Sequence, residues 1–355
     1  MAELLGIGLS HYPPLSGIDS DMAGPLRARL EDPAIPAHAK DPAGWPAVML
    51  EEWGDDRGVA AAAEHRASLV EGFDVCRKAI DDFEPDLVII WGDDQYENFR
   101  EDLIPPYSVL AYPDMVIEPW AHLAGSSAME GKANVWGEDA SARMAVKGAP
   151  REGRWLASQL LDAGIDVSYA YRPLHHPGLA HAFLNTLLYL DYHRRGFPYP
   201  VLCFPINCYG RRVVAQKGYV APIGAEIDYD PPSPPPWRVM DMGAAVGRAL
   251  RDSDLRVALV ASSSWSHAFM VDKTWRMQPD IEADRELYDA LAKGDLDVWR
   301  TRSLDQLEDS GQQELLNWYA LLGAMEAVGR PSPTWSSKVE TYVFNSPKVF
   351  AVFAP

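Results

Sequence analysis

The feature that most constrains the fold is a series of short apolar runs separated by amphipathic segments. The runs have the length and composition of buried strands, and they are Leu4–Leu9, Leu87–Trp91, Val201–Ile206 and Val257–Ala261. The segments between and after them have helical spacing of apolar residues, and they span residues 60–83, 153–163, 179–193, 241–251, 281–292 and 312–328. This alternation predicts an α/β fold with a central mixed sheet flanked by helices.

The length of 355 residues, 47% of them hydrophobic, is sufficient to bury a large core. Neither a repeat nor an interdomain linker is evident, so we expect one α/β domain over residues 1–355. Two stretches rich in Pro, Gly and polar residues, at about 12–55 and 113–150, predict insertions or long covering loops. Trp120 and Trp136 in the second stretch favour an ordered loop. The runs Glu340–Phe344 and Val349–Phe353 predict a terminal hairpin.

The charge balance excludes one class of partner. The formal net charge is -19, which repels phosphate backbones and argues against nucleic-acid binding. No apolar run is long enough to cross a bilayer, and the first residues have neither a basic segment nor a long apolar core typical of a signal peptide. Three cysteines without a CxxC pair suggest no disulfide framework. We therefore expect a cytoplasmic protein that binds no membrane.

Polar residues follow most of the predicted strands. In open α/β sheets, ligands bind beyond the carboxyl ends of the strands. The segments at these ends are Ser10-His11-Tyr12, Gly92-Asp93-Asp94-Gln95, Asn207-Cys208-Tyr209 and Ser262 to His267. His175-His176 follows a further strand-like run, Val167–Tyr171. A single histidine at a strand end is more often a hydrogen-bonding loop residue, but four of nine on one rim predict a site. Histidines and carboxylates together suit a divalent metal, and a free histidine beside them suits proton transfer.

Three common motifs are missing. No G-x-S-x-G surrounds Ser264, so a nucleophile elbow is not indicated. The pair Gly6 and Gly8 lies inside a predicted strand and lacks the rest of a dinucleotide fingerprint. No phosphate-binding P-loop occurs.

In order and spacing, these segments resemble the class III extradiol ring-cleavage dioxygenases of the protocatechuate 4,5-dioxygenase β-subunit type. The segments that carry the resemblance are Ser10-His11-Tyr12-Pro13, the apolar strand that runs into Gly92–Tyr96, the histidines before the middle helix, Ser266-His267, Ile281-Glu282-Ala283-Asp284, and the region from Asp309-Ser310-Gly311 through Trp318 to Met325. The resemblance implies Fe(II) held by two histidines and a glutamate, with a catechol-type substrate and O2 as co-substrate.

The metal ligands that the resemblance implies are His11, Glu282 and a second histidine. Ala283 stands where the family has an aromatic residue after the glutamate. The second histidine is replaced by Gln95, or by Asp94 if the alignment shifts by one residue. Asp93, Asp94 or Glu97 could supply an alternative carboxylate. A glutamine is a harder and weaker donor than imidazole, so this position is the main departure from the family.

The resemblance also implies roles around the metal. His267 corresponds to the acid/base histidine. His176, or His175 if the alignment slips by one residue, would contact the substrate or dioxygen. Substrate contacts are expected from Tyr209, Asn207 and Tyr12, and from Trp265, which would narrow the ring pocket or else pack against the covering loop. Arg211 and Arg212 could receive a substrate carboxylate.

Three functions follow from these residues. The first is an Fe(II)-dependent dioxygenase, an oxidoreductase that opens a catechol-like ring. The second is a metal-dependent hydrolase or lyase on the same scaffold, and the third is a non-catalytic partner subunit; both are motivated by Gln95. The family resemblance implies a homodimer or other homo-oligomer, with a small partner subunit as an alternative.

Overall fold

The computed structural model describes residues 3–123, 131–214 and 216–355. Its centre is an eight-stranded mixed sheet with the order β6-β3-β7-β2-β8-β1-β10-β9. The strands are β1 (Glu3–Leu9), β2 (Leu87–Asp93), β3 (Ser108–Leu110), β6 (Ser168–Ala170), β7 (Val201–Ile206), β8 (Arg256–Ser262), β9 (Trp335–Val339) and β10 (Lys348–Phe353). The prediction of a mixed sheet flanked by helices is therefore confirmed.

The four predicted apolar runs form the middle of this sheet. β1, β8, β2 and β7 are parallel neighbours, with Gly6 opposite Leu259 and Ile90 opposite both Val260 and Cys203. Nearly all of their residues are buried, because helices cover both faces of the sheet. Their carboxyl ends meet at one edge, which places the polar residues that follow them side by side. β10 and β9 extend the sheet in antiparallel fashion beyond β1.

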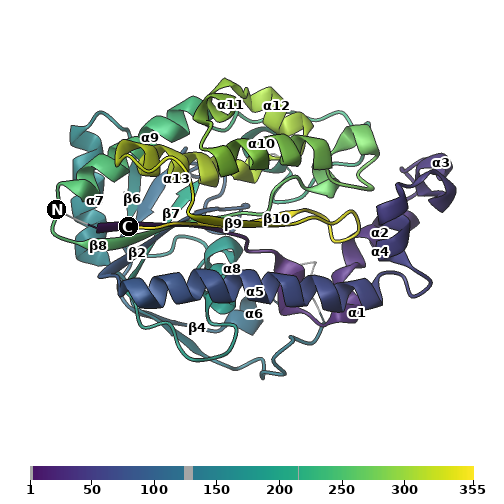
Figure 1. The fold of residues 1–355 in the computed structure, drawn as a ribbon, viewed down its shortest axis with the longest axis horizontal. Coiled ribbons are helices and arrows are strands. Elements are labelled where there is room, and N and C mark those ends of the chain that lie inside the picture. Colours follow the sequence, from purple (N-terminus) through teal and green to yellow (C-terminus); the bar gives the residue numbers. More distant parts are fainter. Residues whose placement is uncertain (1–2, 124–130, 215) are drawn as a thin grey trace.

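Helices cover the two faces of the sheet (Figure 1). The upper layer in this view contains α7 (Pro150–Asp162), α9 (Pro236–Arg251), α10 (Ile281–Lys293), α11 (Leu296–Thr301), α12 (Leu304–Asp309) and α13 (Leu316–Ala327). The lower layer contains α1 (Asp19–Met22), α5 (Val59–Phe83), α6 (Pro119–Leu123) and α8 (His181–Leu190). α13 is apolar on nearly all sides because it lies between the sheet and α9. Glycines permit this close packing, since a Cβ on Gly243 would lie 2.0 Å from the Ala320 carbonyl oxygen.

The two predicted insertions contain regular structure. Residues 12–55 form short helices, which are the 3-10 helices η1 (Pro13–Ser16) and η2 (Pro42–Gly44) and the α-helices α1, α2 (Gly24–Glu31), α3 (Ala37–Lys40) and α4 (Ala47–Trp53). The second insertion contains α6 and a two-stranded antiparallel sheet of β4 (Met115–Ile117) and β5 (Met144–Val146). Trp120 is buried there, and its ring centre lies 5.5 Å from that of Trp136. The expectation of order around these tryptophans is met in the described residues, which leave out 124–130.

The predicted terminal hairpin is partly wrong. Val349–Phe353 lies within β10, but its partner strand is Trp335–Val339 rather than Glu340–Phe344. The segment after β9 leaves the sheet because the Glu52 carboxylate accepts the backbone N–H groups of Tyr342 and Val343, at 2.8 and 2.9 Å. No helix among the described residues is both long and apolar enough to cross a membrane.

Candidate active site

Five ionisable side chains and a phenol meet where the parallel strands end. His11 follows β1, Asp93 is the last residue of β2, and Tyr209 follows β7. His267 follows β8 after four loop residues. His181 begins α8, and Glu314 lies in the 3-10 helix η6 (Gln313–Leu315) that leads into α13. The sheet thus supplies one side of the site and two helix starts supply the rest.

His11 presents one ring nitrogen to the site. Its Nδ1 lies 3.1 Å from the Ser262 carbonyl oxygen, and a carbonyl only accepts, so we assign the Nδ1 proton to this bond. Nε2 therefore faces the two buried carboxylates, 3.3 Å from Asp93 Oδ1 and 3.5 Å from Glu314 Oε2. An Nε2 lone pair directed at two carboxylates needs a positive charge between them, either a second proton or a bound cation.

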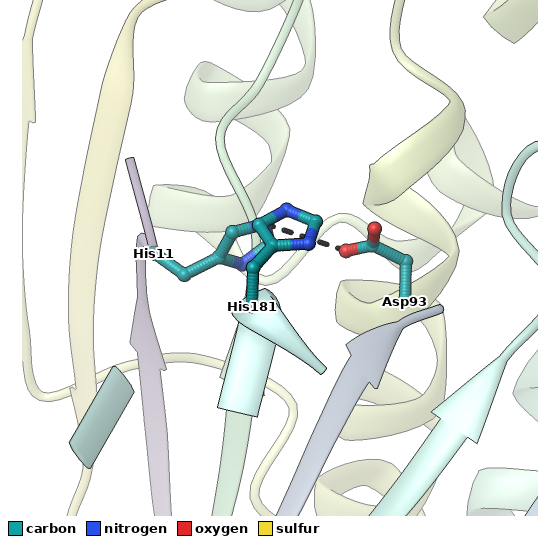
Figure 2. A group of neighbouring side chains, drawn as sticks. All are labelled: His11, Asp93 and His181. Carbon is teal, nitrogen blue, oxygen red and sulfur yellow. Dashed lines mark ion pairs between the residues drawn. The ribbon is translucent and has the colours of Figure 1, made fainter. Parts of the chain in front are cut away.

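Asp93 is buried and has no hydrogen bond on either carboxylate oxygen. Burial and the nearby Glu314 raise the pKa of Asp93 to about 6, although His11 and His181 act in the opposite direction. Figure 2 shows its carboxylate directed at the His11 ring from the end of β2. A buried carboxylate without a hydrogen bond is uncommon and points to a ligand that it would bind.

Glu314 accepts a hydrogen bond on each of its two carboxylate oxygens. Oε2 accepts the Ser264 backbone N–H at 3.0 Å, and Oε1 accepts a short hydrogen bond from the Tyr209 hydroxyl. Burial alone would raise the pKa of Glu314, but His267 and His11 outweigh that effect and hold it well below its usual range. Glu314 is therefore an anion at neutral pH.

His267 lies on the other side of this carboxylate, with Nε2 3.2 Å from Glu314 Oε1. Burial would lower the pKa of His267, but the charge and hydrogen bond of Glu314 raise it above its ordinary value. Its Nδ1 is buried and has no hydrogen-bond partner. A buried histidine with one nitrogen on an anion and the other unengaged is suited to carry a proton.

His181 faces His11 edge-on, with ring centres 5.1 Å apart. Glu97 orients it: Oε2 lies 2.7 Å from Nδ1, and Oε1 accepts the His181 backbone N–H at 2.9 Å. Burial would lower the pKa of His181, but Glu97, with help from Asp93 and Glu314, raises it to about 10. With no metal bound, His181 is thus a cation facing two acids.

The donor set suits a divalent metal. Atoms of His11, Asp93 and His181 all lie within 4.8 Å of one another (Figure 2), and Glu314 adds a second buried carboxylate. Neighbouring donors around a small divalent ion with bonds of 2.0–2.1 Å are roughly 3 Å apart, which is close to the spacing from His11 Nε2 to each acid. A carboxylate that orients the other nitrogen of a histidine is also common around metals.

The structure corrects the predicted glutamate ligand. Glu282 lies in the first turn of α10 with 81% of its side chain exposed, and it pairs with Arg285 at 2.7 Å. Acids in a first helical turn stabilise the positive end of the helix, which accounts for this residue without a metal. The glutamate beside His11 is Glu314.

Gln95 and Asp94, the two residues expected in the place of the second histidine ligand, both have other partners. Gln95 Nε2 donates to the Gly218 carbonyl oxygen at 2.8 Å, in a loop beyond the strand. Asp94 accepts the backbone N–H groups of Glu97, Asn98 and Phe99 and so serves as a turn cap. Of the three polar residues at this strand end, Asp93 contacts His11.

Two predicted substrate contacts point elsewhere. The Trp265 ring packs at 5.6 to 6.4 Å from the rings of Trp318, Trp299 and Tyr288 in the helical layer, neither in the site nor against the covering loop. The Tyr12 hydroxyl donates to the Met22 carbonyl oxygen, and its ring packs under the Lys348 amine in the lower core. Tyr209, in contrast, reaches Glu314 as described above.

The other residues predicted to contact the substrate or dioxygen have partners outside the group of His11, Asp93 and Glu314. His175 pairs with Asp102 at 2.8 Å near the surface. His176 is buried, and its Nδ1 accepts the Gly178 N–H at 3.0 Å. Asn207 is half-buried, and its backbone N–H donates to Pro106. Roles for His176 and Asn207 stay predictions. Both arginines already have acidic partners, which are Asp305 and Glu308 for Arg211 and Asp272 for Arg212.

Sequence reasoning missed Glu314 and His181. Glu314 lies within the segment that resembles the family's C-terminal helix, so the signal was present in Gly311 to Trp318. His181 lies inside the predicted helix 179–193, five residues after His176. Both stand at the starts of helices that point at the strand ends.

Comparison with known proteins finds similar sequences among ring-opening dioxygenases. Residues 229–353 match the family described as the catalytic LigB subunit of aromatic ring-opening dioxygenase. Similar proteins are named 2,3-dihydroxyphenylpropionate/2,3-dihydroxicinnamic acid 1,2-dioxygenase. The one from Rhodococcus sp is 26% identical over 302 residues, covering 73% of this chain and 82% of the relative. The one from Rhodococcus jostii is 25% identical over 303 residues, with the same coverage. The one from Photorhabdus laumondii is 25% identical over 210 residues, which cover 59% of this chain and 52% of the relative.

These matches confirm the resemblance to the class III extradiol dioxygenases, and with it the class of enzyme, a ring-cleaving oxidoreductase. The matched segment includes His267 and Glu314. The two alternatives, a hydrolase or lyase and a non-catalytic subunit, are not favoured.

Proposed function

We propose that this chain uses Fe(II) to open the ring of a catechol-like substrate with O2. His11 and Glu314 would hold the metal. A bound iron would supply two kinds of chemistry: Lewis acidity toward the substrate hydroxyls, and electron transfer from the aromatic ring to O2. The observation that carries this proposal is the buried group of His11, Asp93 and Glu314, in which neither Asp93 carboxylate oxygen accepts a hydrogen bond.

His267 is proposed to move the proton. A catechol must lose hydroxyl protons as it becomes a better electron donor, and the ring-opened product must be protonated again. The Glu314 carboxylate faces His267 Nε2 and raises the pKa of the imidazole, so this nitrogen would hold a proton. The unengaged Nδ1 is the second position at which this ring could take or return a proton.

His181 is proposed to bind an oxygen of the substrate. Glu97 fixes the ring through Nδ1, so Nε2 is the nitrogen left to donate. A cationic imidazole would stabilise negative charge on a substrate oxygen in a site that excludes water. Tyr209, which donates to Glu314 Oε1, would fix the orientation of that carboxylate.

Relatives named for 2,3-dihydroxyphenylpropionate make this compound a suitable first probe. The purified chain would be loaded anaerobically with Fe(II) and mixed with the probe or plain catechol, and O2 uptake and ring absorbance would be followed. We expect one O2 consumed for each ring opened. A metal-loaded protein that consumes no O2 with any catechol would contradict the proposal.

Two further properties belong to the same proposal. A catabolic enzyme of this kind would work in the cytoplasm, and it would form a homo-oligomer. Light scattering on the purified protein measures the second directly, because a mass near 39.4 kDa would indicate a monomer.

A further inference from the structure

The three polar residues at the end of β2 have different tasks. Asp94 caps the turn that follows, and Gln95 is engaged with the Gly218 carbonyl oxygen. Tyr96 has a φ of 62°, in the left-handed region, which turns the chain away directly after Gln95. Only Asp93 of the three is still in the sheet, opposite Ile206 of β7. Its position is therefore set by the strand rather than by the loop.

Asp93 also lacks the hydrogen bonds that a buried carboxylate normally accepts. Both oxygens are buried without a hydrogen bond, and the nearest group that can be positive is His11 Nε2 at 3.3 Å. A second acid, Glu314, faces the same nitrogen at 3.5 Å. His181 supplies positive charge nearby, but neither Asp93 oxygen accepts a hydrogen bond from it or from any other described residue. A bound divalent cation would give this carboxylate the partner that it lacks.

We propose that Asp93 is the third metal donor, in place of the imidazole that the family carries at the position of Gln95. The metal would then be held by one imidazole and two carboxylates, His11, Asp93 and Glu314. This inference rests on the proposed metal-dependent function, and it adds the identity of a donor and a preference among metals.

The preference follows from the chemistry of the donors. Carboxylates suit harder ions such as Mn(II) and Mg(II), whereas imidazole suits Zn(II), Fe(II) and Ni(II). Two carboxylates also cancel the charge of a divalent ion, whereas two histidines and one glutamate leave one positive charge. Relative to a two-histidine site, this site is expected to favour Mn(II) over Zn(II).

The test is metal binding by the purified apoprotein, without turnover. Equilibrium dialysis against Mn(II) and, separately, Zn(II) would compare the wild type with Asp93→Asn, Asp93→His, Gln95→Ala and His181→Asn. We expect Asp93→Asn to lose at least ~10-fold in Mn(II) affinity, because even the outer partners of metal ligands contribute 10–100-fold. Gln95→Ala should bind as the wild type does. Asp93→His should retain binding but lower the ratio of Mn(II) to Zn(II) affinity.

Thermal unfolding provides a second measurement and shows that each variant is folded. Added Mn(II) should raise the unfolding temperature of the wild type and of Gln95→Ala more than that of Asp93→Asn.

The outcomes separate this inference from the proposed function. If the wild type binds metal and Asp93→Asn binds it equally well, or if Gln95→Ala or His181→Asn loses it instead, the inference is overturned and the metal-dependent function stands. If the wild type binds no divalent metal, both are overturned.

Discussion

His267 Nε2 lies 3.2 Å from Glu314 Oε1, and only 8% and 3% of the two side chains are exposed. The opposite oxygen of the same carboxylate faces His11 Nε2 at 3.5 Å. Glu314 therefore joins the proposed metal position to the proposed proton carrier. A change at the metal position should therefore alter the environment of His267. Substitutions can still separate metal binding from proton transfer.

Replacing His267 should abolish turnover and leave the metal in place. In His267→Asn the group that moves the proton is lost, which typically lowers rates by ~10²–10⁴-fold. Fe(II) content after anaerobic loading and the initial rate of O2 uptake would be measured on the same sample. His175→Asn is the control, because His175 pairs with Asp102 near the surface and should leave the rate unchanged. Loss of iron together with activity would show that His267 is a ligand instead.

Replacing Glu314 should remove the metal. Glu314→Gln keeps the size of the side chain but loses the charge that His11 and His267 both face. We expect at least a ~10-fold loss of Fe(II) affinity, measured by equilibrium dialysis under anaerobic conditions.

Glu282→Gln provides the matched control for Glu314. Glu282 is exposed on α10 and pairs with Arg285, so its substitution should change neither metal content nor rate. Equal losses in both variants would mean that the effect arises from something other than ligation.

These two glutamates also show which parts of the site could be inferred from sequence. The strands were predictable because buried parallel strands are continuous apolar runs, and their ends located His11, Asp93, Tyr209 and His267 on one rim. Which glutamate turns inward was not predictable. Both Glu282 and Glu314 stand near a helix start. Only the packing of the folded chain determines that Glu282 faces solvent while Glu314, in η6, lies beside His267.

The same limit applies to the aromatic residues. Trp265 follows β8 directly after the rim serines, and sequence order alone favours a place in the substrate pocket. In the structure, the ring turns into the upper core against Trp318, Trp299 and Tyr288. Adjacent residues of an extended segment point to opposite sides, and the sequence does not reveal which side faces the ligand.

Close packing between β1 and α13 should make Gly8 intolerant of substitution. A Cβ at position 8 would lie 2.0 Å from Trp318 Cη2, and Trp318 is itself buried among other rings. Gly8→Ala should therefore lower the free energy of unfolding by about 1–3 kcal/mol, the usual cost of overpacking a core. Chemical denaturation would measure it. Gly44→Ala is the control, since its nearest neighbour would be 3.8 Å away.

Lys348 should make stability depend on pH. The side chain is fully buried, with Nζ 2.8 Å from the Phe344 carbonyl oxygen, 3.1 Å from His65 Nε2 and 3.5 Å from the centre of the Tyr12 ring. Burial lowers the pKa of Lys348 well below its ordinary value, although Glu52 acts in the opposite direction. A neutral amine can donate to the Phe344 carbonyl oxygen and share a hydrogen bond with His65 Nε2.

The sign of the pH dependence follows from proton counting. Between its lowered native pKa and the unfolded value of about 10.4, Lys348 binds a proton in the unfolded chain but not in the native one. The free energy of unfolding therefore rises with pH across this window. Lys348→Met, which has no amine, should be more stable than the wild type at pH 7, by about 1 kcal/mol or more. Its advantage should shrink as the pH approaches 10.

Urea denaturation at several pH values between 7 and 10 would measure this difference. Lys78→Met is the control, because Lys78 is 74% exposed on α5 and pairs with Asp82, so its substitution should leave the pH dependence of the wild type intact. A Lys348→Met variant that is less stable than the wild type at pH 7 would mean that the amine contributes net stability through its two hydrogen bonds. A difference that stays constant up to pH 10 would mean that Lys348 keeps its proton in the native state, with Glu52 as the counter-charge.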